Sequence, residues 1–246
     1  MIDAGAAYLE VQERLAALVA GLGAAELQRP APACPGWTVV DVLAHHVGVV
    51  SDVVAGGPGE IGDLDRLLDQ WRDPDVARDR DTMSARQVAE RRGRSVDDLL
   101  REWRDAAEVG VPILSGTRPL PEGLSPIVRA VLVNDVVVHE DDVRRALGLG
   151  AAPEVPATSL ALAGYGASFE MRRRQQGLPT LAFAYDGRTR LFGDGEPAAT
   201  VTADRTTLVR LLASRLPEDA IRALDWSGDP TVFVPVLPEY GPAHPD

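Results

Sequence analysis

Histidine is scarce in this sequence, and three of its four histidines lie where they could take part in metal chemistry. Asp135 and His139 are four residues apart, which places both on one face of a helix, and Asp142 continues the same stripe. The neighbouring residues are strongly apolar: Val131, Leu132, Val133, Val136, Val137 and Val138. Because buried polar groups without partners are costly, two interpretations are open. One is a divalent metal site, and the other is an Asp–His hydrogen bond near the surface of a helix bundle.

A metal site would need a third ligand, and the pair His45–His46 offers two candidates on another predicted helix. A carboxylate and two histidines from facing helices form a three-ligand site with open positions, as in catalytic zinc centres. At about 100° per residue, His46 lies closer to the centre of the apolar stripe, and His45 lies to one side. Periodicity alone favours His46, although a core histidine bonded to a backbone carbonyl is an alternative. His244 lies in the Pro-rich tail, where no role is expected.

The single cysteine, Cys34, follows a Pro-rich stretch and precedes Pro35-Gly36. It excludes an intrachain disulfide. No histidine is adjacent to it in the sequence, so we do not expect it to act as a nucleophile.

Helical patterns must position these residues, and four main ones occur in the first part of the chain. Thr38 with Asp41, and Ser95 with Asp98, have the spacing of capping boxes, with aspartate in place of the usual glutamate. The region 60–90 is highly charged, with weak helical patterns around Leu64–Trp71 and Met83–Arg91, and we interpret it as a surface insertion or lid. The four predicted helices, which indicate a bundle, cover residues 4–22, 38–54, 95–110 and 125–147.

The pattern changes after a Gly-rich junction at residues 148–153. We therefore expect two domains, a helical bundle over 1–150 and a small α/β domain over 151–246, which together make an α+β protein. Turns at Asp186-Gly187 and at residues 193–195 separate short strand patterns. The expected elements are helices at 157–176 and 204–224, and strands at 180–185, 188–192, 198–202 and 232–236.

The composition narrows the range of partners. A formal net charge of −12 disfavours nucleic-acid binding, because such a surface repels phosphates. No stretch approaches the roughly 18 apolar residues that span a bilayer, and the N-terminus lacks the pattern of a secretory signal. With one cysteine, these features predict a cytoplasmic protein without membrane or nucleic-acid partners, as a monomer or homodimer.

Three segments resemble one known family. Residues 34–46, Cys-Pro-Gly-Trp-Thr-Val-Val-Asp-Val-Leu-Ala-His-His, resemble the N-terminal signature of the mycothiol-dependent maleylpyruvate isomerases and their DinB-like relatives. Residues 135–142, Asp-Val-Val-Val-His-Glu-Asp-Asp, followed by Ala-Leu-Gly at 146–148, resemble the second signature. Residues 224–229, Leu-Asp-Trp-Ser-Gly-Asp, resemble the end of the family's sterol carrier protein-like C-terminal domain.

The resemblance implies a DinB-like four-helix bundle followed by a sterol carrier protein-like domain. The family's metal-binding histidine comes eight residues after the tryptophan, which is His45 here and not His46. The implied ligands of zinc, or of another divalent metal, are His45, Asp135 and His139. The isomerases have glutamate where this chain has Asp135, which is one methylene shorter.

The resemblance also suggests roles for two residues outside the ligand set. Asp142 is a candidate partner of a ligand histidine. Arg215 falls where relatives carry an arginine that would bind a carboxylate of the thiol or the substrate, although a solvated arginine at a helix end is an alternative.

The implied activity is a mycothiol-dependent isomerisation, in which the activated thiolate adds to an electrophilic small molecule. The chain has no lysine and only one asparagine, Asn134, a composition typical of GC-rich genomes such as those of actinomycetes, which make mycothiol. Two alternatives remain: a mycothiol S-transferase in detoxification or natural-product biosynthesis, and a non-catalytic small-molecule-binding protein that has lost the metal.

Overall fold

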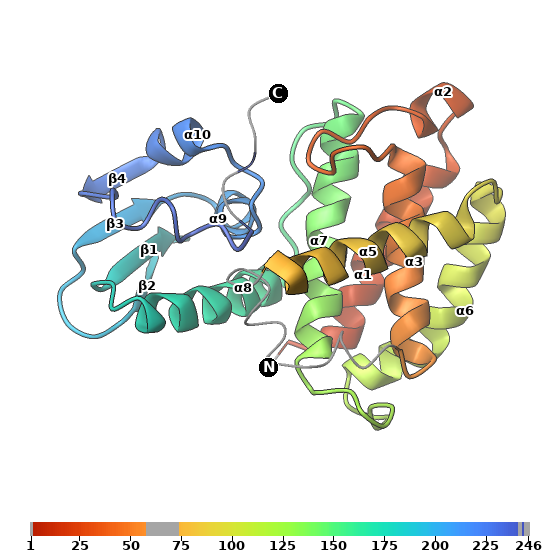
Figure 1. Ribbon diagram of the computed structural model, residues 1–246, viewed down its shortest axis with the longest axis horizontal. Coiled ribbons are helices and arrows are strands. Elements are labelled where there is room, and N and C mark those ends of the chain that lie inside the picture. The colour runs from red at the N-terminus through yellow and green to blue at the C-terminus, as the bar shows by residue number, and fades with distance from the viewer. Residues whose placement is uncertain (1, 58–73, 241–242, 244–246) are drawn as a thin grey trace. The chain divides into compact units, whose positions relative to one another are not determined.

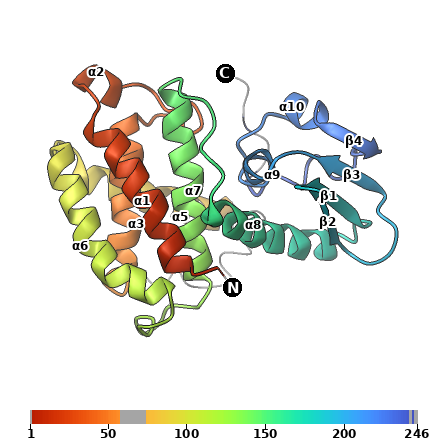
Figure 2. The ribbon, with the colours of Figure 1, turned by 180° about the vertical axis from the view of Figure 1, so that it is seen from behind.

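The computed structural model describes residues 2–57, 74–240 and 243, and these form two compact units, 1–160 and 161–246. Four helices of 16 to 19 residues lie side by side in the first unit, as Figures 1 and 2 show. Helix α1 contacts α6 and α7, and α3 contacts the same two helices. The bounds are Ala4–Ala20 for α1, Val39–Val54 for α3, Val96–Leu114 for α6 and Val128–Ala146 for α7, with a short α2 at Ala24–Leu27.

Local sequence chemistry fixes where these helices begin. The Thr38 side chain accepts a hydrogen bond from the Asp41 backbone N–H, and the Asp41 carboxylate accepts one from the Thr38 N–H, which closes the expected capping box at the start of α3. Ser95 accepts from the Asp98 N–H and caps α6, and its hydroxyl, rather than its backbone N–H, donates to the Asp98 carboxylate. The start of α3 matters most for function, because it sets the helical phase of His45 and His46.

The region expected to be an insertion contributes a further helix, α5, at Pro74–Arg91. Helix α5 packs on α3 and crosses it in Figure 1. A Cβ atom at Gly48 of α3 would lie 2.6 Å from the Gln87 Cβ, so glycine permits this close approach. The weak pattern around Leu64–Trp71 lies outside the described residues.

The second unit contains most of α8 (Pro156–Gln175) and a four-stranded mixed sheet in the order β2-β1-β3-β4. Strands β1 and β3 are parallel and the other pairs are antiparallel. The expected Asp186-Gly187 turn joins β1 to β2, with both residues at positive φ. The strands are Leu181–Tyr185, Arg188–Phe192, Ala199–Thr202 and Asp225–Gly228, and helices α9 and α10 cover Arg205–Leu212 and Glu218–Arg222.

The α+β prediction is confirmed, a helical region followed by a small mixed sheet, but one predicted strand is wrong. Residues 231–236 form successive turns, in which the Phe233 and Val234 N–H groups bond to the Pro230 carbonyl. The fourth strand is instead Asp225–Gly228, which pairs with β3. The expected junction at 148–153 is a loop, whereas the two compact units divide inside α8. Among the helices that the structure describes, none has the length and apolar character needed to cross a membrane.

Candidate metal centre

Helix α7 presents an acid–histidine–acid stripe to the interior of the bundle. Asp135, His139 and Asp142 follow one another at four and three residues along the helix. His139 is 7% exposed and Asp142 is 1% exposed, so these polar groups are buried among the apolar residues that surround them in the sequence. Their partners must therefore be found within the protein.

His45 of α3 meets this stripe from the facing helix. Its Nε2 atom lies 3.5 Å from Asp135 Oδ1, and His139 Nε2 lies 3.4 Å from the same oxygen. The three donor atoms all lie within 4.8 Å of one another. Zinc bonds of about 2.0–2.2 Å in a tetrahedron separate neighbouring donors by about 3.4 Å. The donor set and its spacing therefore fit a zinc-like cation with open coordination positions.

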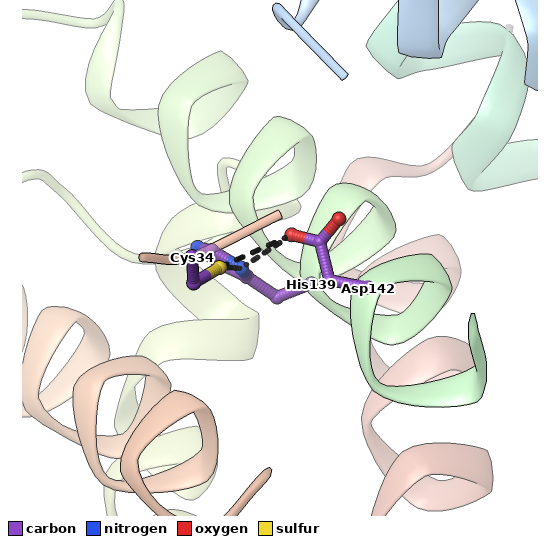
Figure 3. A group of neighbouring side chains, drawn as sticks. All are labelled: Cys34, His139 and Asp142. Atoms are coloured by element: carbon purple, nitrogen blue, oxygen red, sulfur yellow. Dashed lines mark hydrogen bonds and ion pairs between the residues drawn. The ribbon is translucent and has the colours of Figure 1, made fainter. Parts of the chain in front are cut away.

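The other nitrogen of His139 is held by Asp142, as Figure 3 shows. His139 Nδ1 lies 3.0 Å from Asp142 Oδ2, and a carboxylate at this position fixes the tautomer and the ring orientation of a ligand histidine. Nε2, on the opposite side of the ring, is then directed at Asp135 and His45. This is the arrangement expected of Asp142 as a partner of the ligand histidine.

Asp135 has a second interaction that orients it. Its Oδ2 atom lies 2.6 Å from His46 Nδ1, while its Oδ1 faces the two other histidines. The side chain of Asp135 thus contacts three imidazoles at once. His46 is fully buried and is not part of the group of converging donor atoms. Periodicity favoured His46 as the third ligand, but the donor atom that converges with those of Asp135 and His139 belongs to His45.

The electrostatics of the group favour a positive charge between its carboxylates. Burial by itself would raise the pKa of Asp135, but the charge of His139 and hydrogen bonds from three histidines hold it well below its usual value. Burial would also lower the pKa of His139, but Asp135 and the hydrogen bonds around the ring raise it well above its usual value. A proton on His139 or a divalent metal beside it would each supply a positive charge between these carboxylates.

Cys34 lies beside the same histidine, a contact that the sequence did not reveal. Its Sγ atom is 3.8 Å from His139 Nδ1 and 3.6 Å from Asp142 Oδ2. Cys34, His139 and Asp142 thus form a second group of donors able to hold a metal. The contact does not make a nucleophile–base–acid triad, because both partners approach Nδ1, whereas a triad uses opposite ring nitrogens.

Aromatic rings line part of the centre. The Trp37 ring lies 4.9 Å from the His45 ring, and the His45 and His139 rings meet edge to face at 5.2 Å between centroids. His45 Nδ1 is buried and has no hydrogen-bond partner among the described residues. The tryptophan of the Cys-Pro-Gly-Trp segment therefore packs against the histidine that follows it by eight residues.

Arg215 belongs to the second unit, directly after Ser214, which has a positive φ of 63°. It is half-buried, and its guanidinium donates a hydrogen bond to the Ala213 carbonyl. Its suggested role in binding a carboxylate stays a prediction.

Comparison with known proteins identifies the first unit. Residues 8–144, more than half of the chain, match the family model described as the mycothiol maleylpyruvate isomerase N-terminal domain. Two crystal structures of the mycothiol-dependent maleylpyruvate isomerase, one of them a histidine-to-alanine mutant, align over 91% of both chains. The TM-scores are 0.51 and, for the mutant, 0.50, with 14% and 13% identity, so this likeness concerns the fold. A comparison with curated proteins gives no match. The matched residues include His45, Asp135, His139 and Asp142, and the chain belongs to the family of the mycothiol maleylpyruvate isomerase N-terminal domain.

Proposed function

We propose that this protein is a metal-dependent enzyme that uses a low-molecular-weight thiol, mycothiol, to isomerise an electrophilic small molecule. The observation that carries the proposal is the convergence of His45, Asp135 and His139 from two helices with donor spacings of 3.4–3.5 Å to the shared oxygen. Family membership supports the choice of mycothiol and of cis–trans isomerisation.

Each residue of the centre has a distinct task in this proposal. His45 Nε2, Asp135 Oδ1 and His139 Nε2 would hold zinc or another divalent ion and leave positions open. Zinc bound there would keep a coordinating thiol deprotonated at neutral pH. Asp142 accepts a hydrogen bond from the His139 Nδ1–H, so that the Nε2 lone pair is available. Arg215 would pair with a carboxylate of the thiol or of the substrate.

The proposal has two parts that are tested in turn. Metal analysis of the purified protein, with His139→Ala as the comparison, tests the metal centre; one divalent ion per wild-type chain that is lost in the variant is expected. Absence of metal after incubation with zinc would leave a non-catalytic binding protein as the better description. Incubation with mycothiol and maleylpyruvate then tests the reaction. A geometric isomer with free mycothiol recovered supports isomerisation, and a stable thioether product would assign an S-transferase instead.

A further inference from the structure

A line of hydrogen-bonded side chains runs from helix α6 to the candidate metal ligand on α7. Trp103 Nε1 donates to the Tyr8 hydroxyl at 2.9 Å, that hydroxyl lies 3.5 Å from His46 Nε2, and His46 Nδ1 lies 2.6 Å from Asp135 Oδ2. Trp103, Tyr8 and His46 are each 0% exposed. The four residues lie on α6, α1, α3 and α7, so the line includes one residue from each of the four helices that lie side by side.

The donors along this line all point the same way. An indole N–H only donates, so the Tyr8 oxygen accepts from Trp103. The Tyr8 O–H is then available for His46 Nε2, the ring nitrogen beside it. An imidazole that accepts at Nε2 carries its hydrogen at Nδ1, and this hydrogen points to Asp135. Both nitrogens of His46 are therefore used, and neither is left for a metal.

A histidine that merely fills the core would normally bond to a backbone carbonyl. His46 instead makes its shortest contact, 2.6 Å, with a carboxylate, and it does so at the oxygen that the other two histidines do not contact. Hydrogen bonds to an ionised acceptor are roughly twice as strong as those between neutral groups. Such a bond resists rotation of the short aspartate side chain.

We infer that His46 is a positioning residue, which Tyr8 and Trp103 orient, and that it holds Asp135 Oδ2 so that Oδ1 faces His45 and His139. The inference rests on the proposed function in one respect, that Asp135 is a metal ligand. It assigns to His46 a role distinct from ligation and from packing, and it extends the centre to residues of α1 and α6.

Two substitutions of His46 separate positioning from packing. His46→Leu keeps most of the side-chain volume and removes the donor, whereas His46→Asn loses volume but places an amide N–H where Nδ1 was. A packing role predicts that leucine is tolerated better than asparagine. A positioning role predicts the reverse for metal affinity, whatever the two variants do to stability.

The measurement is Co²⁺ affinity, by competition with a chromophoric chelator, together with the visible spectrum of the Co²⁺ protein. His46→Leu is expected to weaken binding by about 10–100-fold and to shift the bands, and His46→Asn to recover most of the loss. Tyr8→Phe removes one neutral hydrogen bond, which corresponds to about threefold to tenfold. Ser51→Ala is the matched control, because its hydroxyl on α3 bonds to Glu102 and not to Asp135. It should leave affinity and spectrum unchanged.

Urea unfolding of each metal-free variant shows which proteins fold, and only folded variants are compared. If His46→Leu binds Co²⁺ with the affinity and the spectrum of the wild-type protein, the inference is overturned and the proposed function stays intact. If that variant does not fold, an unchanged affinity in Tyr8→Phe would have the same consequence. Failure of the wild-type protein to bind Co²⁺ or Zn²⁺ would overturn the proposed function, and the inference with it.

Discussion

Asp142 offers a direct test of how the centre is held together. Its carboxylate is buried and lies 3.0 Å from Nδ1 of His139, the nitrogen that does not face Asp135. Partners of this kind typically contribute 10–100-fold to metal affinity. We expect Asp142→Ala to lose about 100-fold, or roughly 2.7 kcal/mol. Asp142→Asn retains an oxygen acceptor without the charge, and we expect it to lose about tenfold, or roughly 1.4 kcal/mol.

The adjacent residue supplies the control for this experiment. The Asp141 carboxylate is also buried, but it bonds to Arg145 and to the Ala152 N–H. Asp141→Asn should therefore reduce the free energy of unfolding and leave the affinity for zinc unchanged. Competition with a chelator at fixed pH measures the affinity of all three variants. Equal losses for Asp141→Asn and Asp142→Asn, or no loss for Asp142→Ala, would refute the assignment.

Two groups of donors share His139, one with His45 and one with Cys34, and they lead to opposite expectations for the substitutions of these two residues. His45→Ala should abolish zinc binding in equilibrium dialysis and Cys34→Ala should retain it, because Sγ contacts Nδ1 and not Nε2; the reverse result would assign the metal to Cys34, His139 and Asp142. Arg14→Leu leaves the Glu140 carboxylate, 2% exposed, without its bidentate partner, and should lower the free energy of unfolding in urea by about 3 kcal/mol. A loss below about 1 kcal/mol would show that water replaces the arginine. Because the pKa of His139 is raised, its stabilising effect on the metal-free protein is complete below pH 6.5 and disappears as the pH rises through the raised value. The stability difference between wild type and His139→Gln should therefore shrink above about pH 6.5, and an increase with pH would contradict the electrostatic description.

Local chemistry made much of the fold predictable. The capping residues Thr38 and Ser95 begin their helices as expected, and the Asp186-Gly187 pair forms its hairpin turn, because these features depend on residues close together in the sequence. Residues 232–236 show where this reasoning fails. Their apolar composition is typical of a strand, but Pro230 and Pro235 favour turns, and none of the described strands pairs with them.

From helical spacing alone, the candidate centre was predictable only along one helix. The α7 stripe follows from helical spacing, whereas the contact of Cys34 with His139 joins residues 105 positions apart. Periodicity correctly identified His46 as the more deeply buried of the two adjacent histidines, and the family motif identified His45 as the one that meets Asp135 and His139. The role of His46 needed Tyr8, which lies 38 residues away and has no motif of its own.

The hydrogen bonds that hold Asp135 and His139 are made by residues of the protein itself, and this bears on how the proposed metal would be acquired. The ligands come from helices far apart in the sequence, so they can meet only after the bundle has formed. A site that is assembled in advance takes its ion from the surrounding pool by exchange rather than during folding. Exchange follows the Irving–Williams order, in which Cu²⁺ outcompetes Zn²⁺ at nitrogen and oxygen donors. Under the proposed function, the metal found after expression will therefore reflect the medium, and the physiological metal will be determined by what the native cell makes available.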